Sequence, residues 1–199
     1  MSYKNDPQIA KVLSALLPLD ISDGTDKVRR KGQRRAAVIM PLVMREQWRV
    51  ILTQRPETMP QHPGQIAFPG GKVEKGETAR FAALREMEEE VGIKPGAVNL
   101  IGRLPSFDAV SEFRVTPYIG IIDPTAEIIP DPHEVADVFE TPLSFLMDAR
   151  NHVARDIDFD GRVHRLWDMP YTDDDGIYRN IWGMTAMMMY RLYQRGFES

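Results

Sequence analysis

Hydrophobic side chains recur every three or four residues in several segments of the chain, which is the spacing of an amphipathic helix. Four helices are expected on this pattern, over residues 8–17, 79–91, 139–147 and 182–194. Pro18 and Gly92 end the first two, because proline interrupts helical hydrogen bonding and glycine readily adopts the left-handed conformation that follows a helix.

Short apolar runs between turn residues predict strands. They are expected over residues 36–43, 48–53, 65–68, 98–104 and 115–122, with a late hairpin over residues 159–167 and 176–180. Strands alternate with helices, and we find no internal repeat or linker. The pattern therefore predicts a single domain over residues 1–199, of the α/β or α+β class.

The amino-acid composition limits which nucleophiles, metals and partners the protein can use. The chain has 199 residues, a formal net charge of −4 and no cysteine. The absence of cysteine excludes thiol nucleophiles and zinc–thiolate sites, so a bound metal would be a hard cation such as Mg²⁺ or Mn²⁺. The negative charge argues against a nucleic-acid partner. No signal peptide or membrane-spanning run is visible, so a cytoplasmic location without a membrane partner is expected.

A basic cluster, Arg29 to Arg35, precedes the first expected strand. Two interpretations are open for it: a solvated connector, or an electrostatic contact for a polyanionic ligand.

Carboxylates gather on the helix expected over residues 79–91. At about 100° per residue, Glu86, Glu89 and Glu90 fall within roughly 100° of arc, while Glu88 points elsewhere. Like charges at this spacing destabilise a helix unless something positive neutralises them. The pattern therefore predicts an oxygen-rich site for one or more hard cations.

Neighbouring residues fit such a site. Leu84, Met87 and Val91 form an adjacent apolar stripe that would pin the helix to a core. Arg85 is suited to hold carboxylates by paired hydrogen bonds, and Glu77 belongs to the same acidic set. The glycine pair Gly70-Gly71 lets the backbone approach a metal or a phosphate closely.

The segment 71–93 resembles the Nudix box, G-x5-E-x7-R-E-U-x-E-E-x-G-U, in which U is a bulky apolar residue. Every specified position is filled, by Gly71, Glu77, Arg85, Glu86, Met87, Glu89, Glu90, Gly92 and Ile93. The resemblance implies the Nudix fold, a mixed sheet sandwiched between helices. It also implies metal-dependent hydrolysis of a nucleoside diphosphate linked to another group.

The same resemblance implies roles for the site residues. Glu86 and Glu90 would be the principal metal ligands, with Gly70 as a further ligand. Glu89 would be another ligand or the group that activates water, and Arg85 and Glu77 would orient the site. Cations neutralise the phosphate oxygens and lower the pKa of a coordinated water, so no covalent intermediate is required.

Residues 51–71 are similar to the second signature of coenzyme A pyrophosphatases, L-L-T-x-R-S-x3-R-x3-G-x-V-x-F-P-G-G. Pro56 stands where serine is usual and Pro60 where arginine is usual. The similarity implies cleavage of CoA or its thioesters into adenosine 3′,5′-bisphosphate and 4′-phosphopantetheine or its acyl derivative. The substrate-binding residues expected from it are Arg55, Gly64, Phe68 and Gly71.

Several alternatives are open. Another nucleotide derivative, such as ADP-ribose or NADH, would use the same chemistry, and a Nudix-fold binding module would have no turnover. Arg55 either forms a salt bridge or contacts the substrate. The expected partner is a small molecule, and a homodimer is an assembly that the sequence leaves open.

Overall fold

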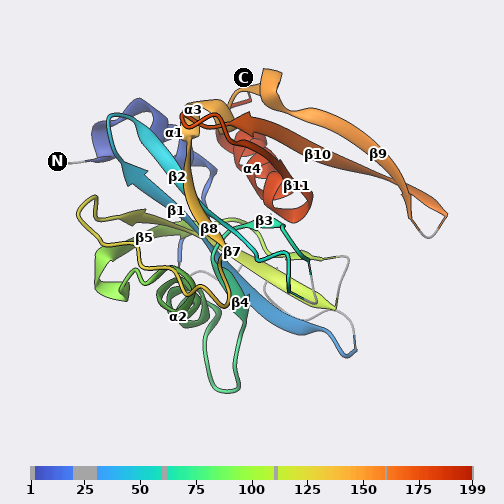
Figure 1. Cartoon of the computed structure of the whole chain (residues 1–199), viewed down its shortest axis with the longest axis horizontal. Coiled ribbons are helices and arrows are strands. Elements are labelled where there is room, and N and C mark those ends of the chain that lie inside the picture. Colours follow the sequence, from blue (N-terminus) through green and yellow to red (C-terminus); the bar gives the residue numbers. More distant parts are fainter. Residues whose placement is uncertain (1–2, 20–30, 60–61, 110–111, 160, 199) are drawn as a thin grey trace.

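The computed structural model describes residues 3–19, 31–59, 62–109, 112–159 and 161–198 (Figure 1). An eight-stranded mixed sheet forms its centre, with β1 and β7 parallel and the other pairings antiparallel. The main strand order is β3-β2-β1-β7-β5, and β4, β6 and β8 pair with β1, β7 and β2. The strands are β1 (Arg34–Met44), β2 (Trp48–Gln54), β3 (Ile66–Ala67), β4 (Gly70–Lys72), β5 (Val98–Arg103), β6 (Phe107–Asp108), β7 (Phe113–Ile122) and β8 (Asp137–Pro142).

Both faces of this sheet are covered by helices, and each face has its own hydrophobic core. Successive side chains of a strand point to opposite faces, so Ile39 of β1 packs toward α2 (Ala79–Val91) while Met40 packs toward the other layer. That layer contains α1 (Pro7–Ala15) and α4 (Gly183–Gly196), which lie against each other. The expected sandwich of a mixed sheet between helices is confirmed (Figure 1).

The first helix begins with a cap that its sequence supplies. The Asp6 carboxylate accepts hydrogen bonds from the amides of Gln8 and Ile9, and Pro7 occupies the first turn. The helix ends at Ala15, two residues before the expected end, because Leu17 forms a bridge with Arg103 of β5. Within the described part of the chain, no helix has the length and hydropathy needed to cross a membrane.

The prediction of a helix over residues 139–147 is wrong for the first half of that range. Phe139 lies in β8, where it pairs with Leu52 of β2, and only α3 (Leu143–Leu146) is helical. This segment pairs with the edge of β2 as a strand, because the pairing buries both Phe139 and Thr141. Pro142 then stands directly before the short helix, a position that proline tolerates.

A second sheet projects from the α4 side of the molecule, with β9 (Val153–Phe159), β10 (Arg162–Thr172) and β11 (Tyr178–Trp182) in the order β11-β10-β9 (Figure 1). The expected late hairpin is therefore β10–β11, and Phe159 belongs to the preceding strand instead. A turn at residues 173–176 joins β10 to β11, and in it the Asp173 carboxylate accepts from the amides of Asp175 and Ile177.

Two members of the basic cluster, Arg29 and Arg30, lie outside the described residues, while Arg34 and Arg35 lie in β1. Arg34, at the start of β1, pairs with Glu112 and lies 4.5 Å from the centre of the Phe113 ring. This arginine is therefore engaged by an acidic neighbour and an aromatic ring of its own chain.

Candidate active site and metal centre

Helix α2 is held by its apolar side, and this determines where its acidic side points. Thr78 caps the start by accepting from the Phe81 amide at 3.3 Å, and Gly92 ends the helix at φ 75°. The buried residues that pack on the sheet are Ala79, Ala82, Ala83, Met87 and Val91, with Leu84 at the margin of the same core. The acidic positions of the last two turns are thereby brought to the side of β4.

Glu90 is the most deeply placed carboxylate of the helix, with 5% of the residue exposed. Its Oε2 accepts a hydrogen bond of 3.1 Å from the backbone amide of Gly70 in β4. Burial raises the pKa of Glu90 to about 8, opposed by this hydrogen bond and by the nearby charge of Arg55. Within the described residues Glu90 forms no ion pair, so its negative charge is poorly compensated.

Glu86 lies one turn earlier, against Gly71. Its side chain is 15% exposed, and burial raises its pKa despite the hydrogen bond from Arg85. A Cβ built on Gly71 would lie 2.4 Å from Glu86 Oε1. Gly71 adopts ordinary backbone angles, so what the glycine provides is room for the Glu86 carboxylate, which a side chain at this position would displace.

Arg85 connects most of the acidic residues of the site. Its guanidinium donates to both oxygens of Glu77, at 3.1 and 3.2 Å, and to the Lys72 carbonyl at 3.1 Å. Nη1 donates to Glu86 at 2.9 Å and to Glu89 at 2.7 Å. The bonds from Arg85 lower the pKa of Glu77, which therefore stays ionised. The contacts expected between Arg85, Glu77 and the acidic helix face are present.

The side chains of the two other glutamates of α2 point in different directions. Glu89 is 52% exposed at the side chain and stays beside Glu86 through their shared partner Arg85. Glu88 pairs instead with Lys94, at 2.7 Å, beyond the end of the helix. The expectation that Glu88 points away from the cluster is confirmed, and its charge is neutralised by that lysine.

The side chains on this side of α2 are of the chemical kind that binds hard cations. Carboxylate oxygens of Glu86, Glu89 and Glu90 lie along one side of α2, and the buried charge of Glu90 would be compensated by a cation. Among the residues described, no three acidic or histidine side chains converge on one point as metal ligands. Arg85 accounts for this spacing, because it draws Glu86 and Glu89 toward itself while Glu90 turns to Gly70.

Arg55 directly follows β2, which ends at Gln54. Its amide donates to the Gln65 carbonyl at 3.0 Å, and its charge acts on Glu90. The Nε atom is buried and makes no hydrogen bond within the described part of the chain. The side chain also forms no ion pair there, which argues against the interpretation of Arg55 as a simple salt bridge.

The other expected substrate-binding residues lie in different surroundings. Gly64 has φ 64° in the loop after Arg55, and a Cβ there would lie 2.2 Å from Glu57 Oε1. Phe68 is 3% exposed and packs in the core toward α4, so its side chain contributes to packing. Pro60 lies outside the described residues.

Glu134, which is not among the site residues expected from the sequence, lies between β7 and β8. Its charge contributes to raising the pKa of both Glu86 and Glu90, which places it near the acidic face of α2. The sequence signal for it is the run from Glu134 to Leu143, which resembles the corresponding segment of CoA pyrophosphatases.

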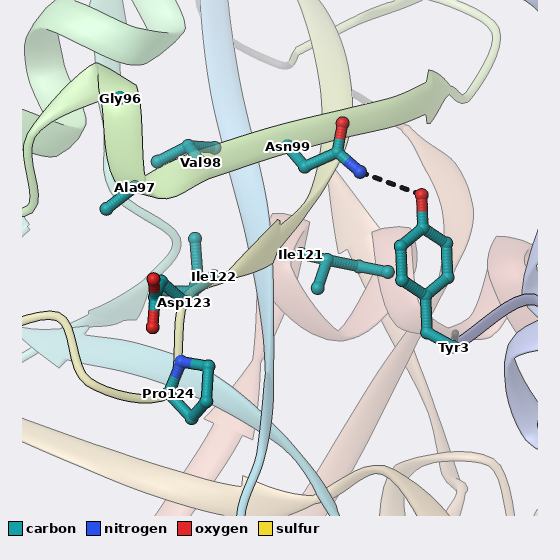
Figure 2. A pocket seen from close by; sticks show the side chains of 9 residues that line it. All are labelled: Tyr3, Gly96, Ala97, Val98, Asn99, Ile121, Ile122, Asp123 and Pro124. Carbon is teal, nitrogen blue, oxygen red and sulfur yellow. Dashed lines mark hydrogen bonds between the residues drawn. The ribbon is translucent and has the colours of Figure 1, made fainter. Parts of the chain in front are cut away.

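A separate pocket of about 530 Å³ lies between the start of β5 and the end of β7 (Figure 2). Tyr3 borders it, with its hydroxyl accepting from Asn99 Nδ2 at 2.7 Å. Asp123 is the charged residue among the described lining, and its carboxylate already bonds the amide and hydroxyl of Thr125. This pocket therefore lacks the groups that hydrolysis or metal binding requires.

Comparison with known proteins agrees with this geometry. The family model described as NUDIX domain matches residues 33–159. A protein of Enterobacter sp. (strain 638), named uncharacterized Nudix hydrolase NudL, is 44% identical over 162 residues, covering 81% of this chain and 82% of the relative. A protein of the same name from Klebsiella pneumoniae (strain 342) is 43% identical over the same shares.

A solved structure supports the fold alone. The MutT/nudix family protein from Enterococcus faecalis aligns with a TM-score of 0.55 at 17% identity, covering 85% of this chain and 64% of that one. The family match and the relatives agree with the complete box over residues 71–93, and this chain belongs to the Nudix hydrolase family.

Proposed function

We propose that this hydrolase cleaves the pyrophosphate bond of coenzyme A and its thioesters, using Mg²⁺ or Mn²⁺. The products would be adenosine 3′,5′-bisphosphate and 4′-phosphopantetheine or its acyl derivative. The observation that supports the chemistry most strongly is the buried, uncompensated carboxylate of Glu90 beside Glu86 and the Gly70-Gly71 backbone.

Glu86 and Glu90 are the residues that would hold the cation, with the Gly70 backbone beside them. A bound divalent cation neutralises phosphate oxygens, acidifies a water molecule and stabilises the departing phosphate. Burial favours this use of Glu90, because a carboxylate in an apolar setting gains more from a nearby cation than an exposed one does.

Glu89 is suited to accept the proton of the attacking water. It is the most exposed carboxylate among the three on this face, so solvent and substrate reach it. Arg85 fixes one of its oxygens beside Glu86, and Glu77 in turn holds Arg85 in place. Removal of the proton makes the water a stronger nucleophile toward phosphorus, and no covalent intermediate is involved.

Arg55 is suited to bind a phosphate of the substrate. Its guanidinium has a hydrogen-bonding group without a partner in the described part of the chain, and lies near the acidic site. Arginine pairs with phosphate by two parallel hydrogen bonds. CoA offers a 3′-phosphate besides its pyrophosphate, so Arg55 is proposed to distinguish CoA from dephospho-CoA.

The CoA assignment rests on the similarity of residues 51–71 to the CoA pyrophosphatase signature. Its departures at Pro56 and Pro60 remove a hydroxyl and a cation that the signature contains. The alternatives are ADP-ribose, NADH and related nucleotides, which present the same pyrophosphate to the same carboxylates.

The test is a turnover panel of CoA, dephospho-CoA, ADP-ribose and NADH, with Mg²⁺ or Mn²⁺ and identification of both products. We expect the highest kcat/KM for CoA or an acyl-CoA, and release of adenosine 3′,5′-bisphosphate. Preference for any other member of the panel would overturn the CoA assignment while leaving the pyrophosphatase chemistry in place.

The role of Arg55 is tested in the same panel. Arg55→Ala is expected to raise KM for CoA more than KM for dephospho-CoA. An equal change for both substrates would remove the proposed contact with the 3′-phosphate.

A further inference from the structure

The last strand of the small sheet and the helix after it lie beyond the part of the chain that the family model matches. That match ends at residue 159, and both β11 and α4 follow it. We call these two elements the C-terminal unit. Both of them contact β3, and Figure 1 shows β11 beside that strand. The C-terminal unit therefore meets the main sheet at the strand that precedes the Gly70-Gly71 backbone.

Thr185 fastens the C-terminal unit to β3 from the α4 side. The residue is 4% exposed, and its Oγ1 donates to the Ile66 carbonyl at 3.0 Å. A Cβ built on Gly183 would lie 3.4 Å from Gln65 Nε2, so the Gln65 side chain lies against the start of the helix. A buried hydrogen bond of this kind fixes the position of the two elements that it joins.

Arg179 fastens the same unit to β8. Its buried guanidinium pairs with Asp173, in the turn before β11, and with Asp137 of β8. The guanidinium also lies 4.3 Å from the centre of the Phe139 ring. Arginine can hold two carboxylates in fixed directions because its guanidinium is a rigid fork. The strands β11 and β8 are therefore joined by charge and by stacking.

These two contacts act on the strands that flank Gln54, the last residue of β2. Gln54 pairs with Ile66 of β3 on one edge of β2 and with Asp137 of β8 on the other edge. Thr185 bonds the first of these partners, and Arg179 bonds the second. The C-terminal unit thus holds both neighbours of the residue at which β2 ends.

Arg55 directly follows that residue and takes its position from the same strands. Its amide donates to the carbonyl of Gln65 at 3.0 Å, one residue before β3 begins. Its side chain makes no ion pair among the described residues, and its buried Nε has no hydrogen-bond partner there. The direction of the guanidinium therefore depends on the backbone that the flanking strands hold.

We propose that Thr185 and Arg179 are positioning residues for substrate binding, which set where Arg55 meets a phosphate. The proposal rests on the function given above, in which Arg55 binds a phosphate of the substrate. In this arrangement the C-terminal unit acts on the substrate through Arg55. Paired hydrogen bonds between arginine and phosphate need close alignment, so a displacement of about 1 Å weakens them.

Thr185→Val tests the first contact, since valine has nearly the same shape and lacks the hydroxyl. We expect KM for CoA to rise roughly 10-fold with kcat within about twofold of native, because binding is lost and the hydrolytic groups stay in place. Thr185→Ser keeps the hydroxyl and should restore the native KM. Thr172→Val, at an exposed position of β10, is the matched control. A native KM in Thr185→Val, or no rescue by serine, would overturn the proposal.

The division between KM and kcat separates positioning from a loss of stability. A variant that is only less stable contains fewer active molecules, which lowers the apparent kcat and leaves KM unchanged. Mn²⁺ affinity of Thr185→Val, measured by calorimetry without substrate, should stay within about twofold of native, since β1 holds the Gly70-Gly71 backbone independently. A fall in kcat with an unchanged KM would contradict the positioning role.

A double-mutant cycle tests whether the effect passes through Arg55. In the Arg55→Ala background, Thr185→Val should change KM by less than about twofold, because the group that it positions is absent. Losses that multiply in the double variant would show that Thr185 acts by another route, and would overturn the proposal.

Arg179→Lys tests the second contact, because lysine retains the charge but cannot hold Asp137 and Asp173 together. We expect KM for CoA to rise roughly fivefold with an unchanged circular dichroism spectrum. Arg165→Lys, in an exposed pair with Asp156, is the control and should keep the native KM. A native KM in Arg179→Lys would contradict its part in the proposal.

Different results would exclude different proposals. If another substrate is preferred to CoA, and Thr185→Val raises its KM only when Arg55 is present, the CoA assignment fails and the positioning role stands. If Arg55→Ala raises KM and Thr185→Val does not, the positioning role alone fails. If Arg55→Ala leaves KM unchanged for every substrate, the role of Arg55 and the positioning role both fail.

Discussion

Arg85 donates two hydrogen bonds to Glu77, from Nε at 3.1 Å and from Nη2 at 3.2 Å, while its third nitrogen bonds Glu86 and Glu89. One guanidinium thus joins the loop before α2 to the acidic face of the helix. It balances carboxylates that would otherwise repel one another. The fork geometry of arginine is what permits all of these contacts at once.

Arg85→Lys tests this geometry. Lysine keeps the positive charge but cannot make paired hydrogen bonds to Glu77 while also reaching Glu86 and Glu89. We expect kcat/KM to fall by about 10–100-fold with the fold retained. Arg150→Lys, in an exposed pair with Asp148, is the matched control and should leave activity unchanged. Full activity of Arg85→Lys would show that charge alone is sufficient.

Glu89→Gln tests the proton acceptor. The amide cannot accept a proton from water, so hydrolysis should fall by at least about 100-fold, with an unchanged circular dichroism spectrum. Glu88→Gln is the neighbouring control, because Glu88 is paired with Lys94 away from the cluster. Retained full activity of Glu89→Gln would refute its proposed role and leave water activation to another group.

Gly71→Ala tests the close approach of the carboxylate. The new Cβ would lie 2.4 Å from Glu86 Oε1, so Glu86 must move. We expect a loss of Mn²⁺ affinity of roughly 10-fold, measured by calorimetry. Gly96→Ala is the control, since a Cβ there meets no atom within 4 Å. Equal affinities of the two variants would mean that Glu86 does not need its observed position.

Glu90 gives the metal-free protein a pH-dependent stability. Its pKa rises from 4.5 to about 8 on folding, so the folded state binds more protons than the unfolded state between these values. Stability should therefore fall as pH rises through this window, by an amount on the order of a few kcal/mol. Below 4.5 both states are protonated and the penalty is absent.

Glu90→Gln removes that penalty. Melting temperatures in EDTA, measured from pH 5 to pH 9, should fall for the native chain relative to the variant as pH rises. Addition of Mn²⁺ should reverse the order, because the cation stabilises only the chain that retains the carboxylate. Parallel pH profiles of the two proteins in EDTA would contradict the burial of an uncompensated charge.

A substitution at Met87 tests how α2 is held against the sheet. It is fully buried between α2 and the sheet, so Met87→Ala should lower the free energy of unfolding by about 2–5 kcal/mol in urea denaturation. Phe81, on the same helix but 62% exposed, is the control, and Phe81→Ala should change it by only about 0.5 kcal/mol. Similar losses for both would contradict the observed packing of α2.

Local patterns predicted the parts of the structure that depend on neighbouring residues. The helix at Ala79–Val91, its glycine end and the shared direction of Glu86, Glu89 and Glu90 all follow from helical periodicity. The strand at Phe139 did not, because it forms only through pairing with β2, a partner distant in sequence. In that case tertiary contact determined the conformation of the segment.

In the site, too, contacts within one segment could be predicted from the sequence and contacts between distant segments could not. Contacts of Arg85 lie within one helix and the loop before it, so sequence spacing could predict them. The burial of Phe68 depends on packing toward α4. The position of the segment that carries Glu134 depends on hydrogen bonds from the amides of Asp131 and Ala136 to the carbonyls of Glu90 and Gln54. No local pattern contains these distant relationships.

The central claim is that Glu86 and Glu90 together hold a cation where a diphosphate is cleaved. Anomalous diffraction from a crystal soaked in Mn²⁺ tests it most directly. We predict a manganese peak in contact with both carboxylates, beside the Gly70-Gly71 backbone. A well-ordered crystal with no manganese at these two side chains would contradict it.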